Sequence, residues 1–295
     1  MGFDPKTDKY PYPEDTDRHY IILKKNDGAV FDENYPYVDR SFGFRFKRFW
    51  VRVCLYILVF PVAKIRLGLR VRGRGNLRRH KELLKGGALS CSNHVHFWDY
   101  IAVMSALRPR RTDVLVWAEN VRGENKKLIR LVGGIPIPDS GVRATIACMK
   151  ATKEYLGNGG WLHVYAEGSM WEYYRPVRPF KSGIGYLACR TGKPVVPMAF
   201  SYRKPGWIRR KIFRQIALFD LAIGEPLLPN EALDIKERET DLVSRCHEEV
   251  CRLAGITPEE DLYPPIYDNS KRVDYYTDTY GKNYGGKAKG NNRNG

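Results

Sequence analysis

The chain has 295 residues, of which 43% are hydrophobic and 13% aromatic. This composition excludes an intrinsically disordered chain and allows one large core or two smaller ones. The formal net charge of +17 predicts anionic partners: nucleic acid, an anionic membrane or acidic substrates. The six cysteines include no Cys-x-x-Cys pair and the polar N-terminus lacks a secretory signal, so we expect reduced thiols in a cytosolic compartment.

The N-terminal part divides into two segments. Residues 1–44 are polar and rich in tyrosine, and we predict an extension there. Residues 45–80 are rich in Lys and Arg and contain no acidic residue, and the apolar run Val53–Ala63 lies among them. This run is too short for a membrane span of about 20 residues. The pattern predicts a basic amphipathic helical element that binds a membrane surface; a buried core helix is the alternative.

Beyond residue 80, apolar runs typical of strands alternate with runs typical of helices. Strands are expected at 88–91, 114–118, 134–137, 161–165 and 195–202, and helices at 100–107, 125–132, 142–156 and 183–191. This alternation predicts an α/β domain over residues 81–262, with a mostly parallel central sheet flanked by helices. We expect an antiparallel or edge strand within 212–224 and a last amphipathic helix over 239–253. The basic tail 263–295 is expected to be disordered.

The most informative segment follows the first of these strands and contains His94 and Asp99. A histidine held by a carboxylate takes a proton from a hydroxyl near neutral pH. Within one helix, residues five apart point about 140° from each other. The two side chains meet only if His94 lies in the turn after the strand and Asp99 opens the next helix. The spacing therefore predicts a catalytic strand–turn–helix corner.

Three other interpretations of this segment stay open. His94-Val95-His96 resembles the start of a metallo-hydrolase signature, although the Asp-His pair of that signature is missing. A structural role is possible, with a satisfied histidine and with Asp99 as a helix cap. Finally, His96 lies three residues before Asp99 and would face it if the helix began early.

A second polar segment follows the expected strand at 161–165. Glu167 and Gly168 stand where α/β proteins bind substrates, beyond the carboxyl ends of the strands. A proline-containing loop then supplies three cations, Arg175, Arg178 and Lys181. This loop is suited to an anionic headgroup, and a solvated basic loop is the alternative.

Four blocks of the sequence resemble the glycerolipid acyltransferases, the lysophosphatidic acid acyltransferase family. They are Asn93-His94-x4-Asp99, Gly133-Gly134-Ile135-Pro136-Ile137, Glu167-Gly168-Ser169 and Lys193-Pro194-Val195-Val196-Pro197. Their order and spacing are specific, although no single block is. The resemblance implies an N-terminal membrane-binding helical element on an α/β domain. It also implies transfer of a fatty acyl group from acyl-CoA or acyl-carrier protein to a glycerolipid hydroxyl in phospholipid synthesis.

The resemblance assigns roles to individual residues. It makes His94 the base and Asp99 the residue that orients it. The implied substrate-binding residues are Asn93, Gly134, Ile135, Pro136, Glu167, Gly168 and Ser169, and we add the cations Arg175, Arg178 and Lys181. Glu167 would bind the acceptor, Gly134–Pro136 would line the site, and backbone N–H groups of this segment would donate to the oxyanion. No metal or cofactor is implied beyond the acyl donor, and the expected location is the cytoplasmic face of a membrane with an anionic surface.

Two positions depart from the family pattern, and they bear on the acceptor. Asp139 and Met170 stand where the family usually has arginine. The expected acceptor is 1-acylglycerol-3-phosphate, its phosphate bound by other nearby cations; the alternative is a different lysolipid or a glycolipid. A non-enzymatic basic protein that binds membrane or nucleic acid is the second alternative. Specific nucleic-acid binding is not expected, because the cations surround an apolar run and do not alternate with stacking aromatics.

Overall fold

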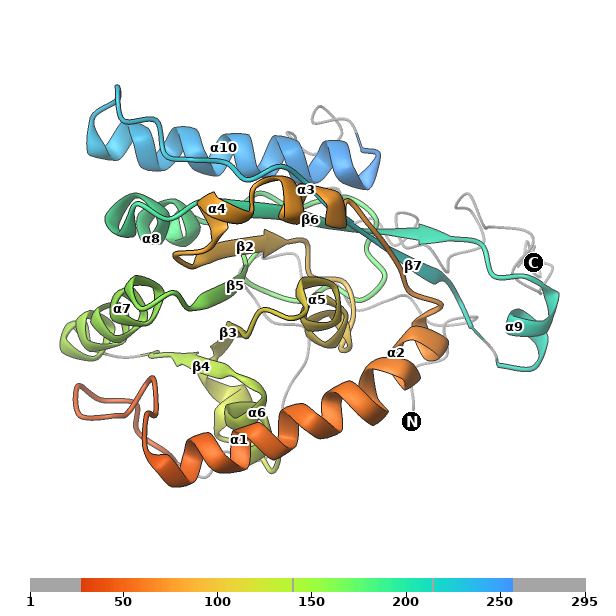
Figure 1. Cartoon of the computed structure of the whole chain (residues 1–295), viewed down its shortest axis with the longest axis horizontal. Helices are drawn as coiled ribbons and strands as arrows, with labels where there is room; N and C mark the ends of the chain where they lie inside the picture. Colours follow the sequence, from red (N-terminus) through yellow and green to blue (C-terminus); the bar gives the residue numbers. More distant parts are fainter. Residues whose placement is uncertain (1–27, 140, 214, 257–295) are drawn as a thin grey trace, which may run out of the picture.

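Seven strands form one sheet in the part of the chain that the structure describes. This computed structural model describes residues 28–139, 141–213 and 215–256; the predicted tail 263–295 and much of the predicted extension 1–44 lie outside the described residues. The strands are β1 (Arg70–Arg72), β2 (Ala88–Ser92), β3 (Thr112–Trp117), β4 (Gly134–Ile137), β5 (Trp161–Tyr165), β6 (Val195–Arg203) and β7 (Leu218–Ile223). Their order is β1-β7-β6-β2-β5-β3-β4, and only β6 and β7 pair antiparallel (Figure 1). The predicted α/β fold with a mostly parallel sheet is confirmed.

Strand β2 lies in the middle of the sheet and positions the site. All five of its residues, Ala88–Ser92, are buried, as in a strand that is covered on both faces. It pairs in parallel with β5 on one side and with β6 on the other. The carboxyl ends of these three strands therefore meet at one edge of the sheet, where open α/β folds bind their ligands.

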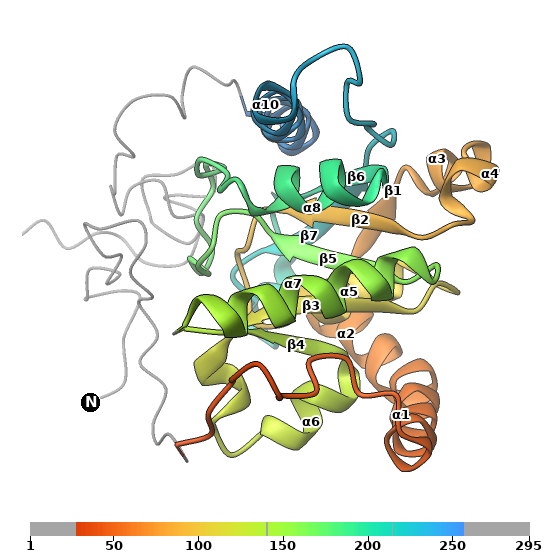
Figure 2. The same ribbon diagram turned by 90° about the vertical axis from the view of Figure 1, so that its left-hand side faces the viewer.

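Helices cover both faces of the sheet. They are α3 (Arg74–Arg79), α4 (Lys81–Leu84), α5 (Asp99–Leu107), α6 (Lys126–Val132), α7 (Val142–Gly157), α8 (Gly183–Thr191), α9 (Trp207–Lys211) and α10 (Ile235–Ala254). One core cluster joins the sheet to α7, α8 and α10, and Figure 2 shows α7 and α8 in front of the strands. A second cluster on the opposite face includes Leu77 of α3 and Ala102 of α5.

A long helix crosses the molecule outside these layers (Figure 1). It runs from α1 (Phe42–Cys54) through a π-helical turn (Leu55–Val59) into α2 (Phe60–Leu67). The side chain of Ser41 accepts a hydrogen bond at its start, and Gly68, with φ 56°, ends it. Glycine is favoured there because a left-handed backbone carries no steric cost without a Cβ.

This helix leaves much of its apolar surface uncovered. The exposed members are Phe42, Phe46, Phe49, Trp50, Tyr56, Ile57, Leu58, Val62 and Ile65. The alternative of a buried core helix is therefore wrong, and membrane binding stays a prediction. Residues 70–80, predicted as part of this element, include β1 of the sheet and α3 beside it. Across the described ranges, no helix has both the length and the apolarity needed to cross a bilayer.

Candidate active site

His94 and Asp99 meet at the turn between β2 and α5. His94 Nδ1 lies 3.1 Å from Asp99 Oδ2. The same carboxylate oxygen accepts hydrogen bonds from the backbone N–H groups of Val95 (2.6 Å) and His96 (2.9 Å). Asp99 is the first residue of α5, so one carboxylate fastens the turn and holds the ring of His94. The structure has the predicted strand–turn–helix arrangement.

The ring of His96 has other partners. Its Nδ1 accepts a hydrogen bond from the backbone N–H of Trp98 at 3.1 Å, and its Nε2 lies 3.8 Å from the Glu172 carboxylate. Its ring packs edge-on against Tyr173 and Phe219. Of the two histidines, the structure places His94 on the Asp99 carboxylate.

The surroundings of His94 keep its imidazole neutral. Burial lowers the pKa of His94 to about 3, an effect that Glu167 opposes and Arg178 reinforces. Burial also raises the pKa of Asp99, against the charge of His96 and the two backbone N–H donors. A neutral ring that donates from Nδ1 leaves a lone pair on Nε2, and Nε2 has no hydrogen-bond partner among the described residues. This is the protonation state that a general base requires.

A buried ion pair holds the backbone of His94 from the other side. Glu167 Oε2 accepts hydrogen bonds from the backbone N–H of His94 and from Arg178 Nη2, both at 3.0 Å. Glu167 Oε1 accepts from the backbone N–H of Arg178 at 2.8 Å. Both side chains are 2% exposed. Arg178 also bonds the hydroxyl and the carbonyl of Ser169, and its guanidinium lies 4.4 Å from the ring centroid of Trp171.

Three predicted substrate-binding residues, Glu167, Ser169 and Arg178, therefore bind one another inside the protein. In this position Glu167 and Arg178 fix the backbone that carries the base. Removal of one partner of a buried ion pair leaves the other charge buried and unpaired, which lowers the free energy of unfolding by about 3–5 kcal/mol. A direct role toward substrate stays a prediction for all three.

The loop after β5 also closes over the turn through its backbone. The N–H of Trp171 donates to the carbonyl of His94 at 3.0 Å, and the N–H of Tyr173 donates to Val95 at 2.8 Å. Gly168 has φ +83°, and a Cβ on it would lie 2.6 Å from Cε of Lys181. Lys181 and Arg175 are the two predicted cations that lie exposed on the surface.

The structure does not bring the other predicted residues to His94. The side-chain amide of Asn93 is buried and bonds the backbone N–H and carbonyl of Phe200 at 2.8 and 3.0 Å, so it joins β2 to β6. Gly134, Ile135 and Pro136 lie in β4, three strand spacings or about 14 Å from β2. The expected oxyanion donors are therefore not beside the base.

The two departures from the family pattern have structural partners of their own. Asp139 accepts a hydrogen bond from Arg122 at 2.9 Å, and this bond lowers the pKa of the Asp139 carboxyl. Met170 is buried. Neither position supplies a cation to the site.

A buried histidine supports the site and was not predicted in this role. His163 on β5 is fully buried and lies between two serines of β2, with Nδ1 2.9 Å from Ser90 Oγ and Nε2 3.2 Å from Ser92 Oγ. Burial lowers the pKa of His163 to about 3. Its ring meets Tyr165 edge-on, and Tyr165 stacks on His94 at 3.7 Å and 13°. Its place in an apolar strand was the only signal in the sequence.

No described His, Cys, Asp or Glu side chains gather in threes or more to form a metal site.

An open cavity of about 1230 Å³ lies beside His96, between α2 and the α9 region. Its lining combines apolar side chains, among them Ile65, Trp207 and Phe213, with cations such as Arg66 and Arg70. This combination suits a ligand with an apolar chain and an anionic group.

Comparisons with known proteins place this site in a family domain. Residues 68–201 match the family model Acyltransferase. This part of the chain is therefore similar to the acyltransferase family, in agreement with the predicted family. Among solved structures, the 1-acyl-sn-glycerophosphate (LPA) acyltransferase PlsC from Thermotoga maritima is similar, with a TM-score of 0.45 and 17% identity over 72% of this chain and 84% of that chain. No curated protein matches the chain.

Proposed function

We propose that the protein transfers a fatty acyl group from a thioester donor to the hydroxyl of a lysoglycerolipid, with His94 as the general base. One observation carries the proposal. A neutral imidazole, held through Nδ1 by Asp99 at 3.1 Å, leaves Nε2 unbonded in the described structure at the carboxyl edge of an acyltransferase-family domain. Acyl-CoA and acyl-carrier protein are the two donors to test.

In this mechanism His94 Nε2 takes the proton of the acceptor hydroxyl as its oxygen attacks the thioester carbonyl. The C–S bond then breaks, and the imidazolium gives the proton to the leaving thiolate. Asp99 fixes the tautomer of the ring and stabilises the imidazolium while it exists. General-base action of this kind contributes about 10²–10⁴ in rate.

The cavity beside His96 supports a lipid substrate. Its apolar lining suits an acyl chain, and its cations suit a phosphate. We propose 1-acylglycerol-3-phosphate as the acceptor, with Arg66 or Arg70 in place of the arginines that Asp139 and Met170 replace. The proposed position is an anionic membrane surface on its cytoplasmic face, and the exposed apolar surface of α1 and α2 supports the contact with a membrane.

The test is acyl transfer by the purified full chain. Labelled acyl-CoA and acyl-carrier protein are each offered with 1-acylglycerol-3-phosphate and with lysolipids that lack a free phosphate. The wild type is expected to acylate at least one acceptor. His94→Ala should lose about 10²-fold or more in kcat, whereas His96→Ala, the neighbouring histidine, should keep most of it. Near-normal turnover by His94→Ala together with loss in His96→Ala would overturn the assignment of the base.

A further inference from the structure

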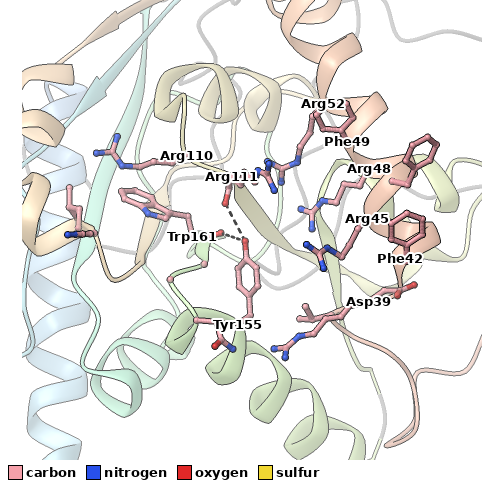
Figure 3. A pocket seen from close by; sticks show the side chains of 18 of the residues that line it. Asp39, Phe42, Arg45, Arg48, Phe49, Arg52, Arg110, Arg111, Tyr155 and Trp161 are labelled. Atoms are coloured by element: carbon pink, nitrogen blue, oxygen red, sulfur yellow. Dashed lines mark hydrogen bonds between the residues drawn. The ribbon is translucent and has the colours of Figure 1, made fainter.

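A second cavity lies at the opposite edge of the sheet from His94. It has a volume of about 1140 Å³ and is bordered by α1, by the end of α7 and by residues at the starts of β3 and β5 (Figure 3). Trp161 opens β5, whereas Tyr165, which stacks on His94, closes it. A strand of five residues is about 16 Å long, so the two sites are separated by the length of the sheet.

The lining of this cavity is strongly cationic. Its charged residues are Arg40, Arg45, Arg48, Arg52, Lys81, Lys85, Arg110 and Arg111, with Asp39 as the single acid. Arg40 pairs with Glu154, and Arg48 and Arg52 share Asp113. The other five cations form no ion pair with any described residue. The cavity therefore holds a large excess of positive charge.

Two of these arginines are largely removed from water. The side chains of Arg48 and Arg52 are 17% and 18% exposed, and both bind the same buried oxygen of Asp113. Arg48 Nε is buried without a hydrogen-bond partner among the described residues. Burial, and then the charge of Arg48, lower the pKa of Arg52. One carboxylate balances only one of the two charges, and an anion in the cavity would balance the second.

Apolar side chains form the rim on the side of α1. Arg45, Arg48 and Arg52 recur at helical spacing and extend toward Tyr155 in Figure 3, while the rings of Phe42 and Phe49 lie along the helix. Phe42 is 84% exposed and Phe49 51% exposed. A ligand that fits this lining has a phosphate at one end and a hydrocarbon chain at the other.

We propose that this cavity binds the phosphate headgroup of an anionic glycerophospholipid of the bilayer, whose acyl chains lie along the exposed phenylalanines of α1. Such a lipid would act as a docking ligand and not as a substrate, because the cavity lies at the edge of the sheet remote from His94. The proposal goes beyond acyl transfer and does not depend on it.

The experiment measures binding to the full chain in solution by calorimetry, so that insertion into a bilayer does not contribute. The probes are dihexanoyl phosphatidylglycerol and dihexanoyl phosphatidylcholine, each below its micellar concentration, and inorganic phosphate. The test variant is Arg45→Ala/Arg111→Ala, which removes two exposed cations of the cavity. The control is Lys150→Ala/Lys236→Ala, which removes the same charge from the exposed surfaces of α7 and α10.

We expect phosphatidylglycerol to bind the wild type and the control equally, and the test variant to bind it about tenfold more weakly, a loss of roughly 1.4 kcal/mol. His94→Ala should bind it as the wild type does. If the control variant bound phosphatidylglycerol as weakly as the test variant, the loss would come from net charge and not from the cavity. If inorganic phosphate bound as tightly as phosphatidylglycerol, the ligand of the cavity would be a free anion. Loss of binding in His94→Ala alone would place the lipid in the catalytic site. Each of these three results overturns the proposal, and none depends on whether acyl transfer is observed.

Discussion

The two edges of the sheet differ in how they balance charge. Around His94 the charges are paired inside the protein: Glu167 pairs with Arg178, and Asp99 holds His94 and the turn around it. At the amino edge Arg48 and Arg52 share one carboxylate, that of Asp113, and exposed cations surround them. The network around His94 is complete without a ligand, whereas the cluster at the amino edge gains a compensating charge only when an anion binds.

This difference corresponds to two kinds of work. General-base chemistry requires the base to stay in one position, and a closed network of hydrogen bonds provides that rigidity. Binding of an anion requires donors whose capacity is not already used inside the protein. Substitutions in the network around His94 should therefore change rate and stability, whereas those in the cationic cavity at the amino edge should mainly change binding.

The largest effect is expected for Asp99→Asn. The amide keeps the shape of the side chain but loses the charge that stabilises the imidazolium of His94. We expect kcat/KM to fall by about 10²–10⁴, measured with the acceptor that the wild type uses best. Urea unfolding is the control. A change in stability with unaltered kcat/KM would show that Asp99 only fastens the turn.

The next effect concerns the buried pair behind His94. Glu167→Gln removes the charge that balances Arg178, and we expect the free energy of unfolding to fall by about 3–5 kcal/mol. The loss is measured by urea denaturation. The double variant Glu167→Gln/Arg178→Met, which leaves no unpaired charge, should recover part of it. No recovery would mean that the pair is not the source of the stability.

Many contacts of the site at the carboxyl edge could be predicted from the sequence, but few of those at the amino edge could. His94 and Asp99 are close in sequence, so a turn and one helix start determine their contact. The strands could be predicted because a central strand such as β2 requires a continuous buried run. Arg48 and Asp113, by contrast, come from distant segments, and their pairing depends on how α1 packs against the start of β3.

The contacts that the sequence did not indicate have physical reasons too. Ser169 and Arg178 are polar residues after a strand, which suggests a ligand site, but their side chains turn inward and bind each other. Gly134 belongs to a motif on β4. This motif would lie beside His94 only if β4 were next to β2, but the sheet order places β5 and β3 between them. Sequence order alone does not determine the order of the strands in a sheet, so this separation could not be predicted.

A third prediction uses pH to examine the buried histidines of the carboxyl edge. Burial lowers the pKa of His94 and of His163 to about 3, and also lowers that of His96. The unfolded chain therefore binds more protons as pH falls below about 6.5, and stability should fall there by up to about 1.4 kcal/mol per pH unit for each of His94 and His163. The raised pKa of Asp99 acts in the opposite direction and offsets one of them.

The measurement is urea denaturation at several pH values between 7.5 and 5.5. His163→Gln removes one buried histidine that does not contact substrate in the proposed mechanism, and it should reduce the total loss of stability over this range by about 1.4 kcal/mol. The same lowered pKa of His94 places the acid limb of kcat/KM below pH 6.5, because the base stays neutral until then. An acid limb above pH 6.5 would contradict a buried, neutral His94.

The smallest effect on stability is expected for an exposed ion pair at the amino edge of the sheet. Arg40 and Glu154 form an ion pair at 2.7 Å, but their side chains are 52% and 56% exposed. Water and salt screen such a pair, so Glu154→Gln should change the free energy of unfolding by about 1 kcal/mol or less. The same Glu-to-Gln change at Glu167 is the matched comparison, since it differs mainly in burial. If both substitutions cost the same, charge compensation inside the protein is not what distinguishes the two edges of the sheet.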